Sequence, residues 1–252
     1  MDMPVNSFKK AILAGQQQVG LWVSLASPYS TEIVAGSGFD WLLIDGEHSP
    51  NDPTTVLPQL QAAAPYPVSA IVRPAWNEKV LIKRYLDIGA QSLLIPYVET
   101  VEQAQAAVAA IRYPLRGARG VAGVTRASRF GRVADYVKRA EEELCLLVQI
   151  ESRLGLDNLD AIARTDGVDG VFIGPADLAA GLGHLGQQGH PEVQKAIEDA
   201  IKRIKALGKP AGILAVDEAS ARRYIEWGTT FTAVGLDAMI LRVESEKLRA
   251  KF

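Results

Sequence analysis

Cysteine and long apolar runs are the two features that this sequence most clearly lacks. Its one cysteine, Cys145, excludes an internal disulfide framework and a cysteine-rich zinc site. The residue lies in the apolar run 144–150 without a neighbouring base, which predicts a buried structural thiol rather than a nucleophile. No apolar stretch approaches the roughly 20 residues that span a bilayer, and residues 1–14 lack the apolar core of a signal peptide. We therefore expect a cytoplasmic protein.

An excess of basic charge is also missing. The chain has 27 Lys and Arg against 29 Asp and Glu, a formal net charge of −2. Binding to nucleic acid or to an anionic membrane usually needs a strong basic excess, so we expect neither partner. Hydrophobic residues make up 48% of the 252 positions, which suffices for one large core. Small-molecule chemistry is the class of function that fits this composition best.

Short apolar runs recur along the chain, and each is followed by a longer helical pattern. This alternation is typical of βα units around a parallel sheet. The predicted strands cover residues 21–25, 41–45, 70–73, 92–97, 144–150, 170–174, 211–214 and 230–235. The predicted helices cover residues 30–36, 53–64, 78–88, 101–111, 154–163, 192–207, 218–227 and 237–250.

Eight βα pairs predict a closed (β/α)₈ barrel, and the length of the chain matches one such barrel. Glycines at the predicted helix ends, such as Gly89 and Gly228, support the count because glycine is the usual residue just after a helix. No linker or change in composition divides the chain, so we expect a single domain over residues 1–252. An open doubly wound sheet is the alternative, but no G-x-G-x-x-G motif follows the first strand.

Polar residues follow four of the predicted strands at the point where each strand ends. In barrels of this kind the catalytic groups come from the carboxyl ends of the strands. Strand two ends in Asp45-Gly46-Glu47-His48, strand three in Arg73-Pro74, strand five in Gln149-Ile150-Glu151 and strand six in Gly174-Pro175-Ala176-Asp177. These four strand ends are therefore expected to point at one spot.

Glu151 and Asp177 are candidate ligands of a divalent cation. Carboxylate oxygens suit Mg²⁺ and Mn²⁺, which keep further positions for water and substrate. The structural alternative is helix capping, because Asp177 opens a predicted helix and Glu151 precedes one. Two carboxylates that each follow an apolar strand favour the metal site, but spacing alone does not decide between the two roles.

His48 and Arg73 are candidate catalytic groups. His48 follows two acidic residues at a strand exit, and its unperturbed pKa of about 6.5 suits a general base. Taken alone, a histidine there is more often a surface residue. Arg73 ends an apolar strand before Pro74, so its side chain needs an anion, either a protein carboxylate or a substrate oxyanion. A purely structural salt bridge is the alternative for Arg73.

The segment Gly174-Pro175-Ala176 suits the anchoring of a substrate carboxylate. Glycine permits close approach, and amides at the start of the next helix are free to bind an anion. His184 and His190 flank a Gly-rich segment that indicates a flexible connection, and we assign them no chemistry. The loop 116–132 either pairs with a neighbouring subunit or receives an anionic substrate through its arginines, Arg116, Arg119, Arg126, Arg129 and Arg132.

Four segments together resemble a known family. The runs GFDWLLIDGEHSP, VRPAW, LVQIES and GVDGVFIGPADLA are similar to those of the HpcH/HpaI family of class II pyruvate aldolases, and the similarity covers nearly the whole chain. The resemblance implies a pyruvate-type barrel that reversibly cleaves 4-hydroxy-2-oxo acids, such as 4-hydroxy-2-oxoheptanedioate or 2-dehydro-3-deoxy sugar acids, to pyruvate and an aldehyde. It also implies a hexamer, a trimer of dimers, in which the apolar final helix packs across subunits.

The resemblance assigns roles position by position. It implies that Glu151 and Asp177 bind Mg²⁺, Mn²⁺ or Co²⁺, that His48 is the base and that Arg73 stabilises an enolate. Either Asp45 or Asp87 would pair with His48. The implied substrate contacts are Arg73, Gln149, Gly174, Pro175, Ala176, Asp177 and, as a wall for the aldehyde, Leu214.

Two other functions remain open at this point. A citramalyl- or malyl-CoA lyase shares the barrel and the metal carboxylates but needs a basic groove for its long substrate. A non-catalytic barrel that binds a metal or a ketoacid is the other alternative. No lysine ends any predicted strand, which argues against a Schiff-base mechanism.

Overall fold

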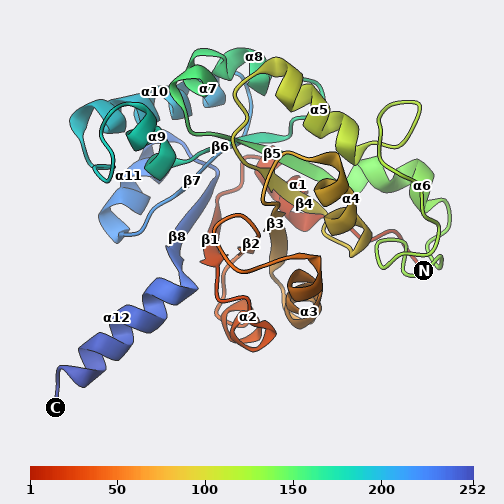
Figure 1. Ribbon diagram of the computed structural model, residues 1–252, viewed down its shortest axis with the longest axis horizontal. Coiled ribbons are helices and arrows are strands. Elements are labelled where there is room, and N and C mark those ends of the chain that lie inside the picture. Colours follow the sequence, from red (N-terminus) through yellow and green to blue (C-terminus); the bar gives the residue numbers. More distant parts are fainter.

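Eight parallel strands close into a barrel in the order in which they occur in the chain (Figure 1). The computed structural model describes residues 1–252, and the ring closes where β1 pairs with β8. The barrel predicted from the sequence is confirmed. Its strands are β1 (Gln18–Val23), β2 (Trp41–Asp45), β3 (Ser69–Arg73), β4 (Ser92–Ile95), β5 (Cys145–Ile150), β6 (Gly170–Ile173), β7 (Ala211–Leu214) and β8 (Phe231–Leu236).

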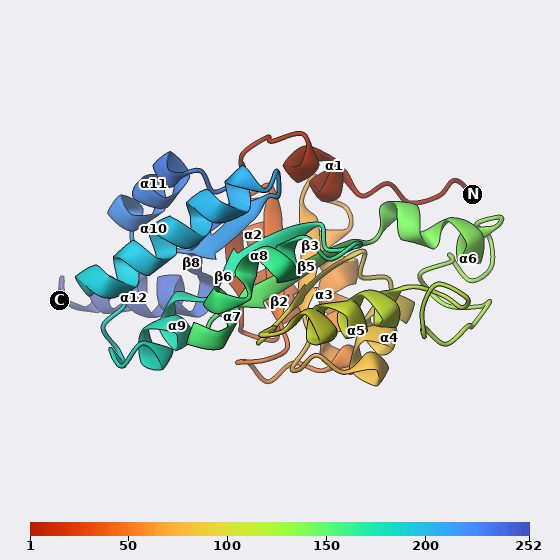
Figure 2. The same ribbon diagram turned by 90° about the horizontal axis from the view of Figure 1, so that it is seen from above.

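Helices surround the barrel and connect its strands (Figure 2). They are α1 (Ser7–Leu13), α2 (Pro28–Ala35), α3 (Pro53–Ala63), α4 (Lys79–Asp87), α5 (Val101–Ile111), α6 (Tyr136–Arg139), the 3₁₀ helix η1 (Ala140–Glu143), α7 (Arg153–Asp157), α8 (Leu159–Ala163), α9 (Pro175–Gly181), α10 (Pro191–Ala206), α11 (Glu218–Trp227) and α12 (Asp237–Arg249). The single helix predicted over residues 154–163 is wrong. The chain turns at Asn158, whose side-chain amide donates to the carbonyl of Glu99 at 2.8 Å, and this contact separates α7 from α8.

Polar side chains fix where several helices begin. The Asp52 carboxylate accepts from two amides at the start of α3, and Thr100 and Gln103 form a reciprocal capping pair at the start of α5. Each such cap contributes roughly 1 kcal/mol to stability. Gly228 ends α11 with a φ of 114°, a left-handed conformation that glycine adopts without strain.

Large aromatic side chains fill the inside of the barrel and close the end at which its strands begin. Phe8 of α1 packs at 5.9 Å from the Trp41 ring and 5.8 Å from the Phe231 ring. Gly20 and Gly212 make room for these rings, because a Cβ atom at Gly20 would overlap the Trp41 indole and one at Gly212 would overlap the Phe231 ring. The interior of the barrel is therefore packed at the amino-terminal ends of the strands, and a cavity inside it lies at their carboxyl ends.

Cys145 is buried on β5, inside this packed region, as predicted. Burial raises the pKa of its thiol well above the ordinary value, which keeps it in the unreactive neutral form. The last helix, α12, extends away from the body of the barrel with the C-terminus at its far end (Figure 1). None of the helices combines the length and apolar character that crossing a membrane requires.

Candidate active site

A cavity of about 240 Å³ opens at the carboxyl ends of the strands. It gathers side chains from β1, β2, β3, β5, β6, β7 and β8, as expected for parallel strands whose carboxyl ends meet on one side of a barrel. Ten of the residues that line it lie within a strand or directly follow one. The lining residues are Trp22, Ser24, Asp45, His48, Arg73, Gln149, Glu151, Phe172, Gly174, Pro175, Ala176, Asp177, Leu214 and Leu236.

Arg73 is held in a fixed orientation by two carboxylates. Its Nε and Nη2 donate to the two oxygens of Asp45 at 2.8 and 2.7 Å, and its Nη1 lies 2.6 Å from Glu47 Oε2. Burial favours the neutral form of Asp45, but the Arg73 guanidinium outweighs it and holds the pKa of Asp45 below its usual value. Of the five N–H groups of a guanidinium, these contacts leave two free to bind another oxygen.

The indole of Trp22 contacts both members of the ion pair between Arg73 and Asp45. Its Nε1 donates to Asp45 Oδ2 at 3.3 Å, and the Arg73 guanidinium lies over the ring at 5.1 Å from its centroid. Arg73 is only 5% exposed, so its charge acts in a poorly hydrated environment. Arg73 therefore has both of the roles that the sequence left open: it forms a structural ion pair, and it keeps free N–H groups that can donate to an anion.

Glu151 lies at the floor of the cavity and is 2% exposed. Its Oε1 accepts from the backbone amide of Tyr97 at 2.8 Å, and its Oε2 accepts from Gln149 Nε2. The chain passes close to this carboxylate at Gly174, where a Cβ atom would collide with Glu151 Oε2 and would lie 2.8 Å from Gln149 Nε2. Glycine is therefore required at position 174 for this arrangement.

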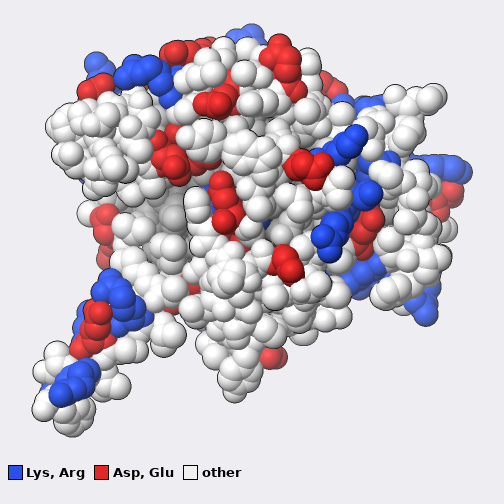
Figure 3. All heavy atoms as spheres, viewed as in Figure 1, with Lys and Arg blue, Asp and Glu red and all other residues white.

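The donor set around Glu151 fits a divalent cation. Glu47, Glu151 and Asp177 lie close enough to influence one another's charge, whereas Arg73 is the only arginine or lysine that lines the cavity. The carbonyl oxygen Oε1 of Gln149 is buried without a hydrogen-bond donor. Acidic side chains also gather near the middle of the corresponding face, over the strands labelled in Figure 1 (Figure 3). Oxygen donors with an excess of negative charge are what Mg²⁺ and Mn²⁺ prefer.

Burial raises the pKa of Glu151 to about 7, and the negative charges of Glu47 and Asp177 add to the shift. The same two causes, burial first and then the charges of Asp45 and Asp177, raise the pKa of Glu47. Because the folded-state pKa of Glu151 lies above its unfolded value, ionisation of this group destabilises the metal-free protein as the pH rises from about 4.5 to 7. A bound cation would offset that cost.

We expect cation affinity to rise steeply with pH up to about 7. Below the pKa of Glu151, a proton competes with the cation for the carboxylate, so the dissociation constant should fall about tenfold per pH unit and level off above pH 7. Isothermal titration with Mn²⁺ between pH 5.5 and 8 measures this slope. An affinity that does not change over this range would contradict the involvement of Glu151.

His48 lies at the edge of the cavity, with 66% of its side chain exposed. The sequence left Asp45 and Asp87 open as its partner, and within this chain neither carboxylate contacts it. Both oxygens of Asp45 are engaged by Arg73, and the one acidic contact of His48 is Glu47 Oε2, 3.9 Å from Nε2. Glu47, which the sequence analysis did not name as a site residue, takes the place expected for Asp45.

Asp87 does not line the cavity. It ends α4, which returns the chain to the amino-terminal side of the barrel, and it accepts a hydrogen bond from Arg119 Nη2 at 3.0 Å. The expectation that Asp87 pairs with His48 is therefore not met within one chain. Family resemblance supplied that expectation, and position along the chain carried no information on the distance between these two residues.

The remaining predicted residues do lie together. Pro175, Ala176 and Asp177 form the first turn of α9, and Gly174 precedes it without any side chain that caps the helix. The first amides of α9 are thus free of a protein partner from the capping position. Leu214 ends β7 and, with Leu236, gives the cavity an apolar wall.

Three contributors to the site were missed by the sequence analysis: Trp22, Glu47 and Tyr97. Trp22 lies in β1, whose end carries no charged residue to mark it. Tyr97 contributes through its backbone, with a φ of 54° that turns its amide towards Glu151. A non-glycine residue in this left-handed conformation is strained and often marks a functional site, but only the structure reveals it.

The arginine-rich loop 116–132 is engaged within its own chain. Arg116 pairs with Glu141 at 2.9 Å, Arg119 with Asp87, and Arg126 donates to the carbonyl of Ile88 at 2.9 Å. The loop lies beside the N-terminus, whose ammonium group donates to the carbonyl of Arg132 at 3.1 Å (Figure 2). Neither role expected for the loop, contact with a second subunit or with substrate, is tested by these contacts.

Comparison with known proteins identifies the family of this chain. The model of the HpcH/HpaI aldolase/citrate lyase family matches residues 18–243. The chain is 63% identical over 252 residues to a pyruvate aldolase of Rhizobium etli, with 100% of this chain and 99% of the relative covered. It is 56% identical over 248 residues to a 4-hydroxy-2-oxo-heptane-1,7-dioate aldolase of Klebsiella pneumoniae, covering 98% and 94%.

A solved structure agrees as well. The crystal structure of an HpcH/HpaI aldolase/citrate lyase family protein from Burkholderia cenocepacia superposes with a TM-score of 0.94 at 42% identity, over 98% of this chain and 99% of that one. Fold, site and full-length similarity lead to one assignment. This chain belongs to the HpcH/HpaI aldolase/citrate lyase family and is a carbon–carbon lyase of the aldolase type.

Proposed function

We propose that this protein is a divalent-metal-dependent aldolase that reversibly cleaves 4-hydroxy-2-oxo acids to pyruvate and an aldehyde. One observation carries the proposal: carboxylates suited to a cation, Glu151 and Asp177, share a cavity with the firmly oriented guanidinium of Arg73. The names of the relatives, a pyruvate aldolase and a 4-hydroxy-2-oxo-heptane-1,7-dioate aldolase, support the same substrate class.

Glu151 and Asp177 would hold the cation, with the unpaired Oε1 of Gln149 beside them. Bound there, a divalent cation would supply Lewis acidity that stabilises negative charge on the oxygen of an enolate. The pyruvate carboxylate would lie against the first turn of α9, where the amides of Ala176 and Asp177 lack a capping side chain. The missing side chain at Gly174 leaves the space for this approach.

Arg73 would stabilise the charge that develops as the carbon–carbon bond breaks. The electron pair of that bond moves onto the keto oxygen, and the two N–H groups that Asp45 and Glu47 leave free can donate to it. Since Asp45 and Glu47 fix the guanidinium before substrate arrives, little reorganisation is needed during the reaction.

His48 would accept the proton of the 4-hydroxyl group, which becomes the aldehyde oxygen. Its exposed position lets the proton pass on to solvent. The enolate then takes a proton at its terminal carbon and leaves as pyruvate, so atoms and charge balance. Leu214 and Leu236 form the apolar wall against which the aldehyde half would pack.

Release of pyruvate from 4-hydroxy-2-oxo acids, coupled to lactate dehydrogenase, tests the proposal. We expect protein stripped with EDTA to be inactive and to regain activity with Mg²⁺, Mn²⁺ or Co²⁺. The Glu151→Gln variant serves as a matched control, which should stay inactive when the metals are restored. Full activity of the stripped wild-type protein would contradict the metal requirement.

A CoA-thioester lyase on the same barrel is the competing reaction class. Such a substrate needs basic side chains near the cavity, but Arg73 is the only arginine or lysine that lines it, and acidic side chains lie near the middle of this face (Figure 3). Cleavage of citramalyl-CoA or malyl-CoA at a rate above that of the 4-hydroxy-2-oxo acids would favour the lyase. The absence of any turnover would favour a barrel that only binds ketoacids.

We also propose that α12 packs against a second copy of the chain within a hexamer. The helix extends from the barrel (Figure 1). It exposes apolar side chains, including Ile240 at 47%, Leu241 at 59% and Leu248 at 59%. An unpartnered apolar helix face of this kind favours association. We expect Leu241→Glu to yield a smaller assembly in light scattering, whereas Glu244→Gln on the same helix should not. An unchanged mass for Leu241→Glu would contradict the role of α12.

A further inference from the structure

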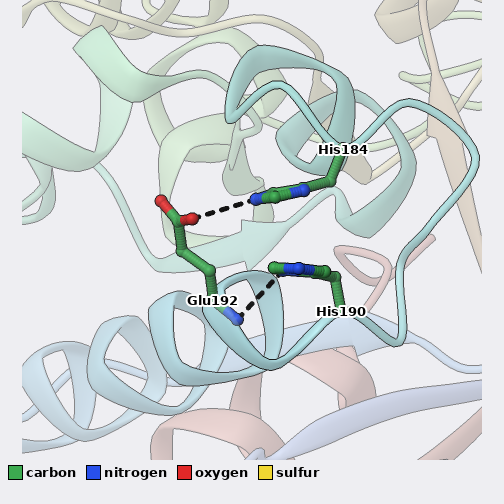
Figure 4. Close-up of side chains that lie close together, drawn as sticks. All are labelled: His184, His190 and Glu192. Atoms are coloured by element: carbon green, nitrogen blue, oxygen red, sulfur yellow. Dashed lines mark hydrogen bonds and ion pairs between the residues drawn. The ribbon is translucent and has the colours of Figure 1, made fainter.

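His184, His190 and Glu192 form a cluster outside the cavity (Figure 4). His184 Nε2 lies 2.9 Å from Glu192 Oε2, and the two imidazole rings stack with centroids 3.6 Å apart and planes inclined by 17°. One possible ligand atom from each residue lies within 4.8 Å of the other two. The sequence analysis gave these histidines no chemistry because the segment appeared to be a flexible connection.

The backbone of the connection between α9 and α10 holds the cluster together. The amide of His184 donates to the carbonyl of Ala179 at 2.7 Å. The amide of Gln187 donates to the carbonyl of His184, and the amide of His190 to the carbonyl of Gln187, each at 2.9 Å. Glycines with left-handed φ values precede and follow His184, at 87° for Gly183 and 75° for Gly186. The segment is therefore a folded loop that brings its two histidines face to face.

Few side chains compete for the two imidazoles. His184 is partly shielded, with 20% of its side chain exposed, while Glu192 is 55% exposed. Glu192 is the only side chain that bonds to His184, and no arginine, lysine or hydroxyl group bonds to either imidazole.

We propose that His184, His190 and Glu192 form a second metal site that binds a borderline divalent cation of the zinc class. Two imidazoles and one carboxylate suit Zn²⁺, Ni²⁺ or Cu²⁺, whereas the oxygen donors in the barrel suit Mg²⁺ and Mn²⁺. Three protein ligands leave further positions to water. The two sites would thus sort cations by ligand type, and the second does not depend on the proposed aldolase reaction.

The rearrangement needed for binding is small. Ligand atoms about 2.1 Å from a tetrahedral ion lie about 3.4 Å apart, so the widest separation in the cluster has to close by a little more than 1 Å. His190 Nδ1 accepts a hydrogen bond of 3.3 Å from the amide of Glu192, at the start of α10. If that nitrogen binds the cation, only this long capping contact is lost.

Zinc titration of the full-length, untagged protein in saturating Mg²⁺ tests the proposal, since Mg²⁺ fills the oxygen site in the barrel. We expect one further Zn²⁺ per chain. The variant His190→Asn removes the imidazole and keeps a good capping residue, and it should weaken this binding more than about tenfold, because even outer partners of a metal site change affinity 10–100-fold. His184→Gln should do the same.

His48 is the only other histidine in the chain and provides the control. Zinc affinity should be unchanged in His48→Gln, and pulsed EPR of Cu²⁺ bound to that variant should show imidazole nitrogen, which can then come only from His184 and His190. Equal zinc affinity in the wild type and His190→Asn would overturn the proposal. So would a copper spectrum of His48→Gln without imidazole nitrogen, and circular dichroism would establish that each variant is folded.

Discussion

We expect the replacement of Arg73 with alanine to lower kcat about a thousandfold, the upper range for the loss of one preorganised donor to a developing oxyanion. The guanidinium is 5% exposed and is oriented by Asp45 and Glu47, so solvent cannot easily replace it. Cation affinity should not fall, because removing a positive charge makes the cavity more negative. Steady-state kinetics together with Mn²⁺ titration of the same preparation separates the two effects.

The Arg73→Ala variant also leaves one buried carboxylate, Asp45, and one partly buried carboxylate, Glu47, without their counterion, which is destabilising. Asp45→Asn combined with Arg73→Ala removes one of those charges and should regain stability in thermal unfolding without regaining activity. Arg73→Lys keeps the charge but not the forked geometry and should fall between the wild type and Arg73→Ala. Normal turnover in folded Arg73→Ala would sink the assigned role.

Changing Gly174 to alanine should weaken cation binding about 10–100-fold and lower activity in parallel. The added Cβ would lie 2.8 Å from both Gln149 Nε2 and Glu151 Cβ, so the Glu151 side chain has to move away from its contacts with Gln149 and Tyr97. Mn²⁺ titration and turnover at saturating Mn²⁺ measure the two losses.

Gly181→Ala provides the matched control, because a Cβ there would meet its nearest atom, Ser152 Cα, at an ordinary 3.6 Å. Both variants add one methyl group at an end of α9, so only the position differs. Gly181→Ala should keep full cation affinity and activity. If Gly174→Ala behaves like Gly181→Ala, the close approach at Gly174 does not control the carboxylate.

The barrel and most of the cavity were predictable because a parallel barrel converts chain order into spatial order. Once β2, β3, β5 and β6 were located, the side chains that follow them, such as Asp45, Arg73, Glu151 and Asp177, had to converge at one end. The sequence therefore contains this part of the site in its alternation of apolar and polar segments.

The contacts inside the cavity were not predictable in the same way. His48 had two candidate partners, Asp45 from its position and Asp87 from the family resemblance, and the structure gives it neither within one chain, because Asp45 is satisfied by Arg73 and Asp87 accepts from Arg119. Pairing depends on side-chain reach and on which charges neutralise each other, neither of which appears in strand spacing. The loop fold at His184 and the backbone turn at Tyr97 depend on single φ angles and were missed for the same reason.

The aromatic side chains of Phe8, Trp41 and Phe231 close the barrel at one end, so its cavity opens only at the other end. A molecule that reaches Glu151, which is 2% exposed, has to pass His48 at the edge of the cavity. The next molecule to bind then covers it. Of two molecules in such a cavity, the one that binds last has to leave first. In the synthetic direction the ketoacid would have to enter before the aldehyde, and in cleavage the aldehyde would depart first, so the packing at the sealed end imposes an ordered kinetic sequence at the open one.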